Sequence, residues 1–395
     1  MLDGKTAPWP NFTEEEIDAV ARVLRSNKVN YWTGPEGREF EKEFAIFAGT
    51  DHAIAVANGT LALDLALHGS KVGSRNGGKE TDEVIVTPRS FLASASSIVN
   101  AGARPVFADV DPDSQNITPT TVAPVITGNT KAIMCVHLAG WPCDMDGFRD
   151  LIAGRDIKLI EDCAQAHGAT YKGRPVGGLG DVGGWSFCQD KIMTTGGEGG
   201  MVTCNDQDVW KRMWAFKDHG KNWDTVYNHK HAPGFRWLHE SFGTNWRLTE
   251  MQSAIGRIQL TRMPDWHEQR TRNAQDLIDV LAPLAGSNGP LRLTVAKDGT
   301  YDQPTGFKHA YYKFYAFVRP ERLPTGMTRD DVVEHFISQG LACFQGGCSE
   351  MYLEKAFKTS AFSTDKRLPV AKELGETSLM FLVHPGVSKI EVSLP

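Results

Sequence analysis

No apolar run in the sequence approaches the length of a membrane-spanning helix, so we do not expect a membrane protein. Basic residues are not in excess either, since 42 Lys and Arg stand against 48 Asp and Glu, for a formal net charge of −6. Because no basic stripe with interleaved aromatics is present, we expect no binding to nucleic acid. The first residues lack the basic-then-apolar order of a signal peptide, and we therefore expect a cytoplasmic protein.

Cysteine is scarce and scattered. The seven cysteines include no Cys-x-x-Cys pair, and several lie in apolar, strand-like runs. An odd, scattered set of this kind predicts reduced core thiols, with neither a disulfide framework nor a zinc site. His229 and His231 are poorly spaced for metal ligands and lie in a polar loop, where solvated side chains are the simpler interpretation. We therefore expect no metal site.

Short apolar runs alternate with helical segments through the first half of the chain. This alternation is typical of an α/β fold with a mainly parallel sheet flanked by helices. From about Leu291 the pattern changes to that of a smaller α+β unit. We expect a large domain over residues 1–262 and a small domain over residues 263–395, joined by a helix over residues 266–281. Seven apolar runs predict a sheet of about seven strands, and they start at Ala53, Glu83, Pro105, Lys131, Lys158, Trp185 and Met201.

Capping residues indicate where several helices begin. Asn11 or Thr13 can cap a helix whose first turn is acidic, and a second helix is expected over residues 36–48. Thr249 is a candidate cap for a helix that runs to about residue 260, and Thr328 for one over residues 329–340.

One lysine occupies an unusual place between two of the expected strands. Residues 185–187 form a short buried strand, Lys191 follows at once, and a glycine cluster leads into the strand over residues 201–204. A desolvated lysine tends to lose its proton and become a nucleophile, which favours a Schiff-base lysine that captures a carbonyl cofactor. The alternative is a surface lysine on a hairpin turn. This stretch alone leaves both interpretations open.

A glycine turn joins the strand over residues 53–57 to a helix. The first turn of such a helix exposes free amides and a positive dipole end that suit a phosphate, although Asn58 or Thr60 can also act as an ordinary cap. Phe91 follows the next strand at its carboxyl end, where it could stack on a planar ring or pack as a core aromatic. Asp162 lies at another strand tip and could face a ligand nitrogen or cap the next turn.

Residues 178–183 match the dinucleotide fingerprint G-x-G-x-x-G. That fingerprint requires a strand before it and a helix after it. Here a polar turn precedes the motif and a strand follows it, so we discount it.

Several of these segments together resemble one family. Residues 58–60, 161–168, 186–187, 191–200 and 245–247 recur, in this order, in the DegT/DnrJ/StrS sugar aminotransferases. The resemblance covers nearly the whole chain, and it implies the fold type I architecture of pyridoxal 5'-phosphate (PLP) enzymes. It further implies an enzyme that moves an amino group, with L-glutamate as the expected donor, onto a keto-sugar for bacterial surface polysaccharide or lipopolysaccharide synthesis.

The resemblance also gives individual residues their roles. Lys191 is the implied catalytic residue, which bonds to the cofactor and carries protons. Asp162 is implied to pair with the ring nitrogen and Phe91 to stack on the ring. Further implied cofactor contacts are the ring hydroxyl for Gln165, the phosphate for Gly59, Thr60 and Ser186, and the phosphate of a neighbouring subunit for Asn245. An obligate homodimer with shared sites follows from the last of these roles.

Two departures from the family pattern bear on the substrate. The residues before the lysine are often His-Pro-containing in the family and here include Asp190, and residues 343–352 differ from the stretch common in nucleotide-sugar members. An oxidised octulosonate sugar acid, as used by an 8-amino-3,8-dideoxy-octulosonate transaminase, therefore stands beside a nucleotide-linked keto-hexose. A carboxylate or phosphate clamp could come from Arg89, Arg236, Arg247 and Lys313, for which surface solvation is the simpler alternative.

Three other functions remain as rivals. A PLP-dependent dehydratase or lyase of the same family is disfavoured by Lys191, because the family dehydratases lack the Schiff-base lysine. A nicotinamide oxidoreductase would depend on the discounted glycine motif. A non-catalytic binding protein of the same fold is the third.

Overall fold

The computed structural model describes residues 8–230, 234, 236–294, 306–347 and 349–387. A seven-stranded sheet with the order β1-β9-β8-β5-β4-β2-β3 lies at its centre. Six of these strands share one direction, and β9 alone runs against its neighbours β1 and β8. The predicted α/β fold and its seven strands are thereby confirmed. The bounds are β1 His52–Val56, β2 Glu83–Val86, β3 Arg104–Phe107, β4 Thr130–Val136, β5 Lys158–Asp162, β8 Val182–Ser186 and β9 Gly200–Cys204.

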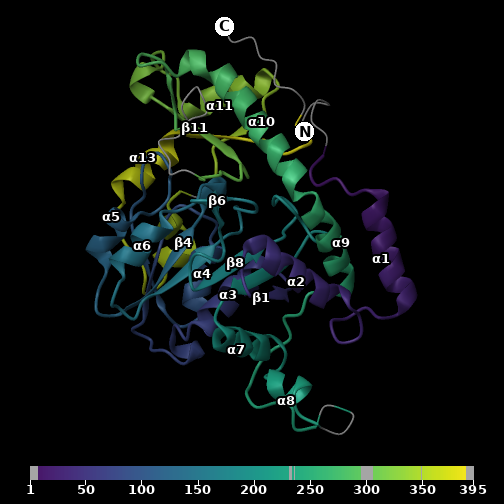
Figure 1. Cartoon of the computed structure of the whole chain (residues 1–395). Helices are drawn as coiled ribbons and strands as arrows, with labels where there is room; N and C mark the ends of the chain where they lie inside the picture. Colours follow the sequence, from purple (N-terminus) through teal and green to yellow (C-terminus); the bar gives the residue numbers. More distant parts are fainter. Residues whose placement is uncertain (1–7, 231–233, 235, 295–305, 348, 388–395) are drawn as a thin grey trace.

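Both faces of this sheet are buried, as expected for a parallel sheet. Successive side chains of a strand point to opposite faces, so Ile85 packs in one apolar cluster while Val84 and Val86 pack in another. Helices cover both faces (Figure 1). They are α2 Glu36–Ala48, α3 Gly59–Gly69, α4 Ala93–Asn100, α5 Pro119–Val122, α6 Met145–Leu151 and α7 Gln207–Lys217.

The capping predictions agree with the structure. Thr13 is the N-cap of α1 (Glu14–Ser26), and the Glu16 carboxylate accepts from its backbone N–H at 2.7 Å and its hydroxyl at 3.0 Å. Thr249 caps α9 (Glu250–Thr261) in the same reciprocal way. The discounted glycine motif is followed by strand β8, not by a helix.

A second, antiparallel sheet forms the C-terminal part of the chain, with the order β10-β11-β13-β12. Helix α10 (Met263–Leu281) runs from the end of α9 to this part, as Figure 1 shows. The placement of the domain boundary at residue 262 stays a prediction. The remaining elements are β10 Leu291–Leu293, β11 Phe314–Val318, α11 Arg329–Ser338, β12 Cys343–Phe344, α12 Lys355–Lys358, α13 Pro369–Thr377 and β13 Ser378–Phe381, with a small hairpin of β6 Thr170–Tyr171 and β7 Arg174–Pro175 beside the large sheet.

A polar arm, described over residues 218–230 and 236–245, extends away from the large sheet and carries the short helix α8 (Trp223–Tyr227) at the bottom of Figure 1. Trp237 and Phe242 of this arm are highly exposed. At the other end of the chain, Trp9 donates its indole N–H to the Lys191 carbonyl at 2.9 Å and stacks on His384. Among the described residues, none of the helices has both the length and the apolar character needed to cross a membrane.

Candidate active site

A cavity of about 530 Å³ opens at the carboxyl ends of the parallel strands, where open α/β sheets bind ligands. Most of the residues that the sequence singles out line it. They are Gly59 and Thr60 from the start of α3, Phe91 from the turn before α4, Asp162 from the end of β5, Gln165 just beyond it, Ser186 from the end of β8, and Lys191.

Lys191 lies on the connection between β8 and β9, with its side chain only 15% exposed. Its Nζ is 3.5 Å from Asp190 Oδ1 and donates to the Tyr312 hydroxyl at 3.4 Å. The Tyr312 hydroxyl in turn donates to the other Asp190 oxygen. The interpretation as a solvated surface lysine is therefore wrong, because the amine is largely buried at the wall of the cavity.

Asp162 also lines the cavity, in the last position of β5, and is only 4% exposed. Its Oδ2 accepts from the Ser94 hydroxyl at 2.7 Å, and its Oδ1 accepts from the Ala164 backbone N–H at 3.1 Å. Burial raises the pKa of Asp162, while these two donors and the nearby Lys191 oppose the rise. A buried carboxylate of this kind can pair with a protonated ring nitrogen of a ligand.

The first turn of α3 forms a cradle for an anion. Asn58 is the N-cap, and its side chain accepts from the Leu61 N–H at 3.0 Å, so the capping interpretation of Asn58 is confirmed. The amides of Gly59 and Thr60 border the cavity at the positive end of the helix dipole. A Cβ at position 59 would lie 2.5 Å from the Ser186 Cβ and 2.8 Å from its hydroxyl, so only glycine fits beside Ser186. Asn58 can therefore cap the helix while the Gly59 and Thr60 amides remain available to an anion.

Two further predicted residues, Phe91 and Gln165, line the cavity. Phe91 is 72% exposed, which excludes the core-aromatic alternative and leaves its ring available to a ligand in the cavity. Gln165 accepts the Ala139 N–H at 2.8 Å on its amide oxygen, and this bond orients its NH₂ group.

Asn245 is not brought together with the other site residues of its own chain. It is exposed, lies at the base of the arm and pairs with Asp218 through a β-bridge, and it does not line the cavity. The four clamp candidates do not line it either. Arg247 donates to Asp218 at 2.7 Å, and Arg89 is buried and donates to Gln115 at 2.9 Å.

Sequence reasoning assigned no role to Asp190, Tyr312 or Ser94, although all three contact predicted site residues. Asp190 adjoins Lys191 in the sequence and is the departure from the family pattern, so its position was a usable signal. Tyr312 lies 121 residues beyond Lys191, and no local pattern connects the two.

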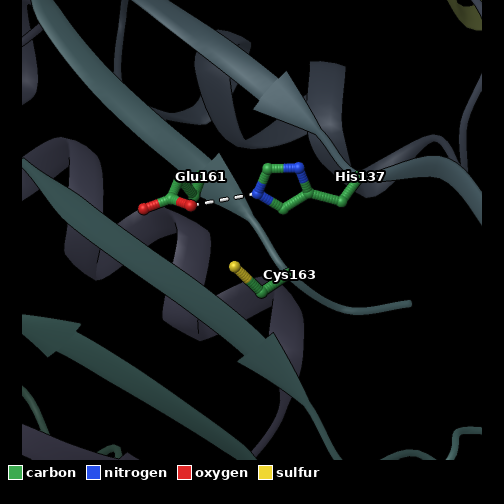
Figure 2. A group of neighbouring side chains, drawn as sticks. All are labelled: His137, Glu161 and Cys163. Atoms are coloured by element: carbon green, nitrogen blue, oxygen red, sulfur yellow. Dashed lines mark hydrogen bonds and ion pairs between the residues drawn. The ribbon is translucent and has the colours of Figure 1, made fainter. Parts of the chain in front are cut away.

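A second cluster of polar side chains, the His–Glu–Cys cluster, lies buried beneath the cavity and comprises His137, Glu161 and Cys163 (Figure 2). Its ligand-type atoms all lie within 4.8 Å of one another, as in a metal site. Figure 2 shows the His137 ring pointing at the Glu161 carboxylate, with Nε2 3.0 Å from Oε2. The other ring nitrogen accepts the Cys143 backbone N–H at 3.0 Å, so the ring proton sits on Nε2.

The groups of the His–Glu–Cys cluster are already satisfied without a metal. Besides the His137 ring, the Glu161 carboxylate accepts the backbone N–H groups of Gly177, Leu179 and Gly180 at 2.9, 2.8 and 2.6 Å. Burial raises the pKa of the Cys163 thiol, which disfavours the thiolate that a metal requires. Through Glu161, the cluster therefore anchors the loop over residues 177–180 to β5.

Fold and site together define a class of enzyme that works with a lysine amine: this amine and a buried carboxylate line one cavity, beside a helix N-terminus, in an α/β fold. Comparison with known proteins makes this specific. The chain matches the DegT/DnrJ/EryC1/StrS aminotransferase family over residues 10–393. It therefore belongs to this family, and it is an aminotransferase.

Individual relatives cover almost the whole chain. It is 40% identical over 386 residues to the GDP-perosamine synthase of Caulobacter vibrioides, covering 97% of this chain and 94% of the relative. The crystal structure of an aminotransferase from Psychrobacter cryohalolentis superimposes with a TM-score of 0.91 at 57% identity, covering 97% and 95%. DesV from S. venezuelae gives a TM-score of 0.79 at 30% identity, covering 95% and 91%.

Proposed function

We propose that this protein is a PLP-dependent aminotransferase that moves an amino group from L-glutamate onto a keto-sugar. The observation that carries the proposal is the placement of the Lys191 amine and the Asp162 carboxylate on one cavity whose wall includes the open first turn of α3. The names of the relatives, which include a GDP-perosamine synthase and a trideoxyglucose transaminase, support a keto-sugar as the acceptor.

The residues present fit this cofactor. The close approach of Gly59 to Ser186 leaves a concave backbone surface for a phosphate, which the Gly59 and Thr60 amides and the Ser186 hydroxyl would bind. Phe91 would cover the ring, the Gln165 NH₂ group would donate to its hydroxyl oxygen, and Asp162 would accept from its protonated nitrogen.

When bound, PLP supplies an aldehyde that accepts the amino group and a ring that withdraws electrons. Lys191 would hold this aldehyde covalently and, once released, would carry a proton from the α-carbon of glutamate to the carbon that had carried the aldehyde oxygen. In the second half-reaction it would move protons in the opposite sense at the sugar carbon. Asp190 and Tyr312 orient the Lys191 amine between these steps. The Asp190 carboxylate contacts the amine nitrogen, and the Tyr312 hydroxyl contacts both that nitrogen and the Asp190 carboxylate.

We propose a homodimer in which Asn245 of one protomer reaches the phosphate site of its partner. Two observations support this: Asn245 is exposed outside the cavity of its own chain, and the adjoining arm presents Trp237 and Phe242 to solvent. Exposed aromatic side chains on a projecting arm are typical of a surface that a second subunit covers.

The acceptor sugar is proposed to be a nucleotide-linked keto-hexose, in line with the relatives. The departure at residues 343–352 keeps an oxidised octulosonate sugar acid as the second candidate. Both would serve surface polysaccharide or lipopolysaccharide synthesis in the cytoplasm.

The test is a visible spectrum of the purified protein with PLP, followed by addition of glutamate. We expect a yellow absorbance band that glutamate bleaches and that each candidate keto-sugar, if it is the substrate, restores. Lys191→Ala should show neither the band nor turnover, whereas Lys308→Ala, which removes an exposed lysine outside the cavity, should match the wild type.

Other outcomes would overturn the proposal. A protein that stays colourless with PLP and binds NAD would be an oxidoreductase. A band that glutamate leaves unchanged would argue for a lyase or a binding protein.

A further inference from the structure

We propose that Ser94, backed by Ser90, is a positioning residue that keeps the Asp162 carboxylate ionised and aimed at the ring nitrogen of the cofactor. The inference rests on the proposed function, because the ring nitrogen belongs to PLP. No part of the sequence pattern or of the family resemblance assigned a role to either serine.

The geometry is that of a chain of hydroxyl groups ending on a carboxylate. The Ser90 and Ser94 hydroxyl oxygens are 3.0 Å apart, and the Ser94 hydroxyl donates to Asp162 Oδ2 at 2.7 Å. Both serines are buried and line the cavity together with Asp162. Ser94 lies in the first turn of α4, whereas Asp162 ends β5, so the bond fixes the carboxylate to a second element.

The carboxylate needs this donor because few groups balance its charge. Oδ1 has the Ala164 backbone N–H, while the Lys191 side chain acts on the carboxylate only over a distance. His137 directs its Nε2 at Glu161 instead. Burial raises the pKa of Asp162, and the Ser94 hydroxyl is the strongest of the groups that hold the rise back.

Removing the hydroxyl therefore shifts Asp162 toward its neutral form. A neutral Asp162 cannot hold the ring nitrogen protonated, and the ring would then withdraw electrons less well. A hydrogen bond to a charged group corresponds to roughly a tenfold change in an equilibrium constant, so Ser94→Ala should weaken PLP binding about tenfold.

The chain offers a matched control on the same helix. Ser97 is as buried as Ser94, but its hydroxyl donates to the Ser94 backbone carbonyl at 3.3 Å and does not reach Asp162. Ser97→Ala removes the same atom one turn away. It should change the dissociation constant for PLP by less than about twofold, because it removes only a neutral hydrogen bond away from the carboxylate.

Two measurements separate positioning from simple packing. The first is the ¹⁵N NMR signal of ring-labelled PLP on the protein, which we expect to report a protonated nitrogen in the wild type and in Ser97→Ala. In Ser94→Ala we expect a shift toward the unprotonated position.

The second measurement uses the protein without cofactor. A buried carboxyl whose folded-state pKa is raised binds a proton more tightly when folded, so its contribution to stability falls as pH rises through that pKa. Because Ser94→Ala raises this pKa further, its thermal midpoint should drop below that of the wild type more at pH 8 than at pH 5. The deficit of Ser97→Ala should be the same at both values.

The outcomes distinguish this inference from the proposed function. If the wild type takes up no PLP, the proposed function fails, and the cofactor-free pH comparison still tests the bond between Ser94 and Asp162. If the wild type binds PLP but Ser94→Ala matches Ser97→Ala in the NMR signal and in the pH comparison, the role of Ser94 is refuted.

Discussion

Replacing Glu161 by glutamine tests whether the His–Glu–Cys cluster is an anchor for the fold. The carboxylate is fully buried and accepts four N–H donors, two on each oxygen: Leu179 and Gly180 on Oε1, and Gly177 and the His137 ring on Oε2. A glutamine must place its NH₂ group where one of these oxygens was. In either orientation the NH₂ group faces two N–H donors. Moving the His137 ring proton from Nε2 to Nδ1 would relieve one of these clashes, but Nδ1–H would then face the Cys143 N–H.

The expected loss of stability follows from the number of N–H donors that the glutamine NH₂ group faces. Losing two hydrogen bonds to a charged group, each worth about 1.5–3 kcal/mol, predicts a loss of about 4 kcal/mol in the free energy of unfolding. Glu250→Gln is the matched control, because Glu250 is also buried but each of its oxygens accepts a single backbone N–H, from Glu36 and Gly37. Its loss should be about 2 kcal/mol.

Urea unfolding of the cofactor-free protein, followed by tryptophan fluorescence, gives both values from the midpoints at a common slope. Burial alone would raise the pKa of Glu161, but the His137 and backbone donors outweigh it and lower the pKa. The stability that this carboxylate contributes is therefore present above its unfolded-state pKa and disappears as pH falls through the folded-state value. The gap between wild type and Glu161→Gln should accordingly narrow below about pH 4. A loss for Glu161→Gln no larger than that for Glu250→Gln would contradict the anchor.

Three further predictions follow from the geometry. Gly59→Ala should keep the fold but weaken PLP binding more than tenfold in a fluorescence titration, because the new Cβ would lie 2.5 Å from the Ser186 Cβ. An affinity equal to that of the wild type would show that the first turn of α3 does not bind the phosphate. Arg257→Met should lower the free energy of unfolding by about 1 kcal/mol, since its guanidinium bonds Glu43 and Glu36 of α2 from α9, and 1 M NaCl should shrink the difference; a salt-independent loss would point to packing instead. Dialysis against EDTA should leave the thermal midpoint unchanged, because the His–Glu–Cys cluster is satisfied without an ion, and a drop that zinc reverses would show the opposite.

Much of the fold follows from local sequence signals. The N-caps Thr13, Thr249 and Thr328 begin helices where predicted, because the capping side chain and the residue three positions on satisfy each other within one turn. The seven strands follow from short apolar runs that the sheet buries on both faces. Predicted bounds are less exact: the strand expected over residues 185–187 begins three residues earlier, at Val182.

The candidate site was predictable only in part. The order of the motifs pointed to Lys191 and Asp162, and the structure places both on one cavity. The contacts that orient them were not foreseen, since Tyr312 reaches Lys191 from 121 residues away and Ser94 reaches Asp162 from another element. Such pairings depend on how the elements pack, and no periodicity within either segment encodes them.

The reversed strand β9 has a consequence for how the chain is made. Strand β1 lies at the edge of the sheet, and its one neighbour there, β9, follows about 150 residues later. While the ribosome synthesises the intervening segment, β1 has no partner, and its apolar residues Ile54 and Val56 stay open to misassociation. Nascent chains that stop before residue 204 should therefore bind chaperones or aggregate. Chaperone binding and aggregation should decrease once β9 has left the ribosome and can pair with β1.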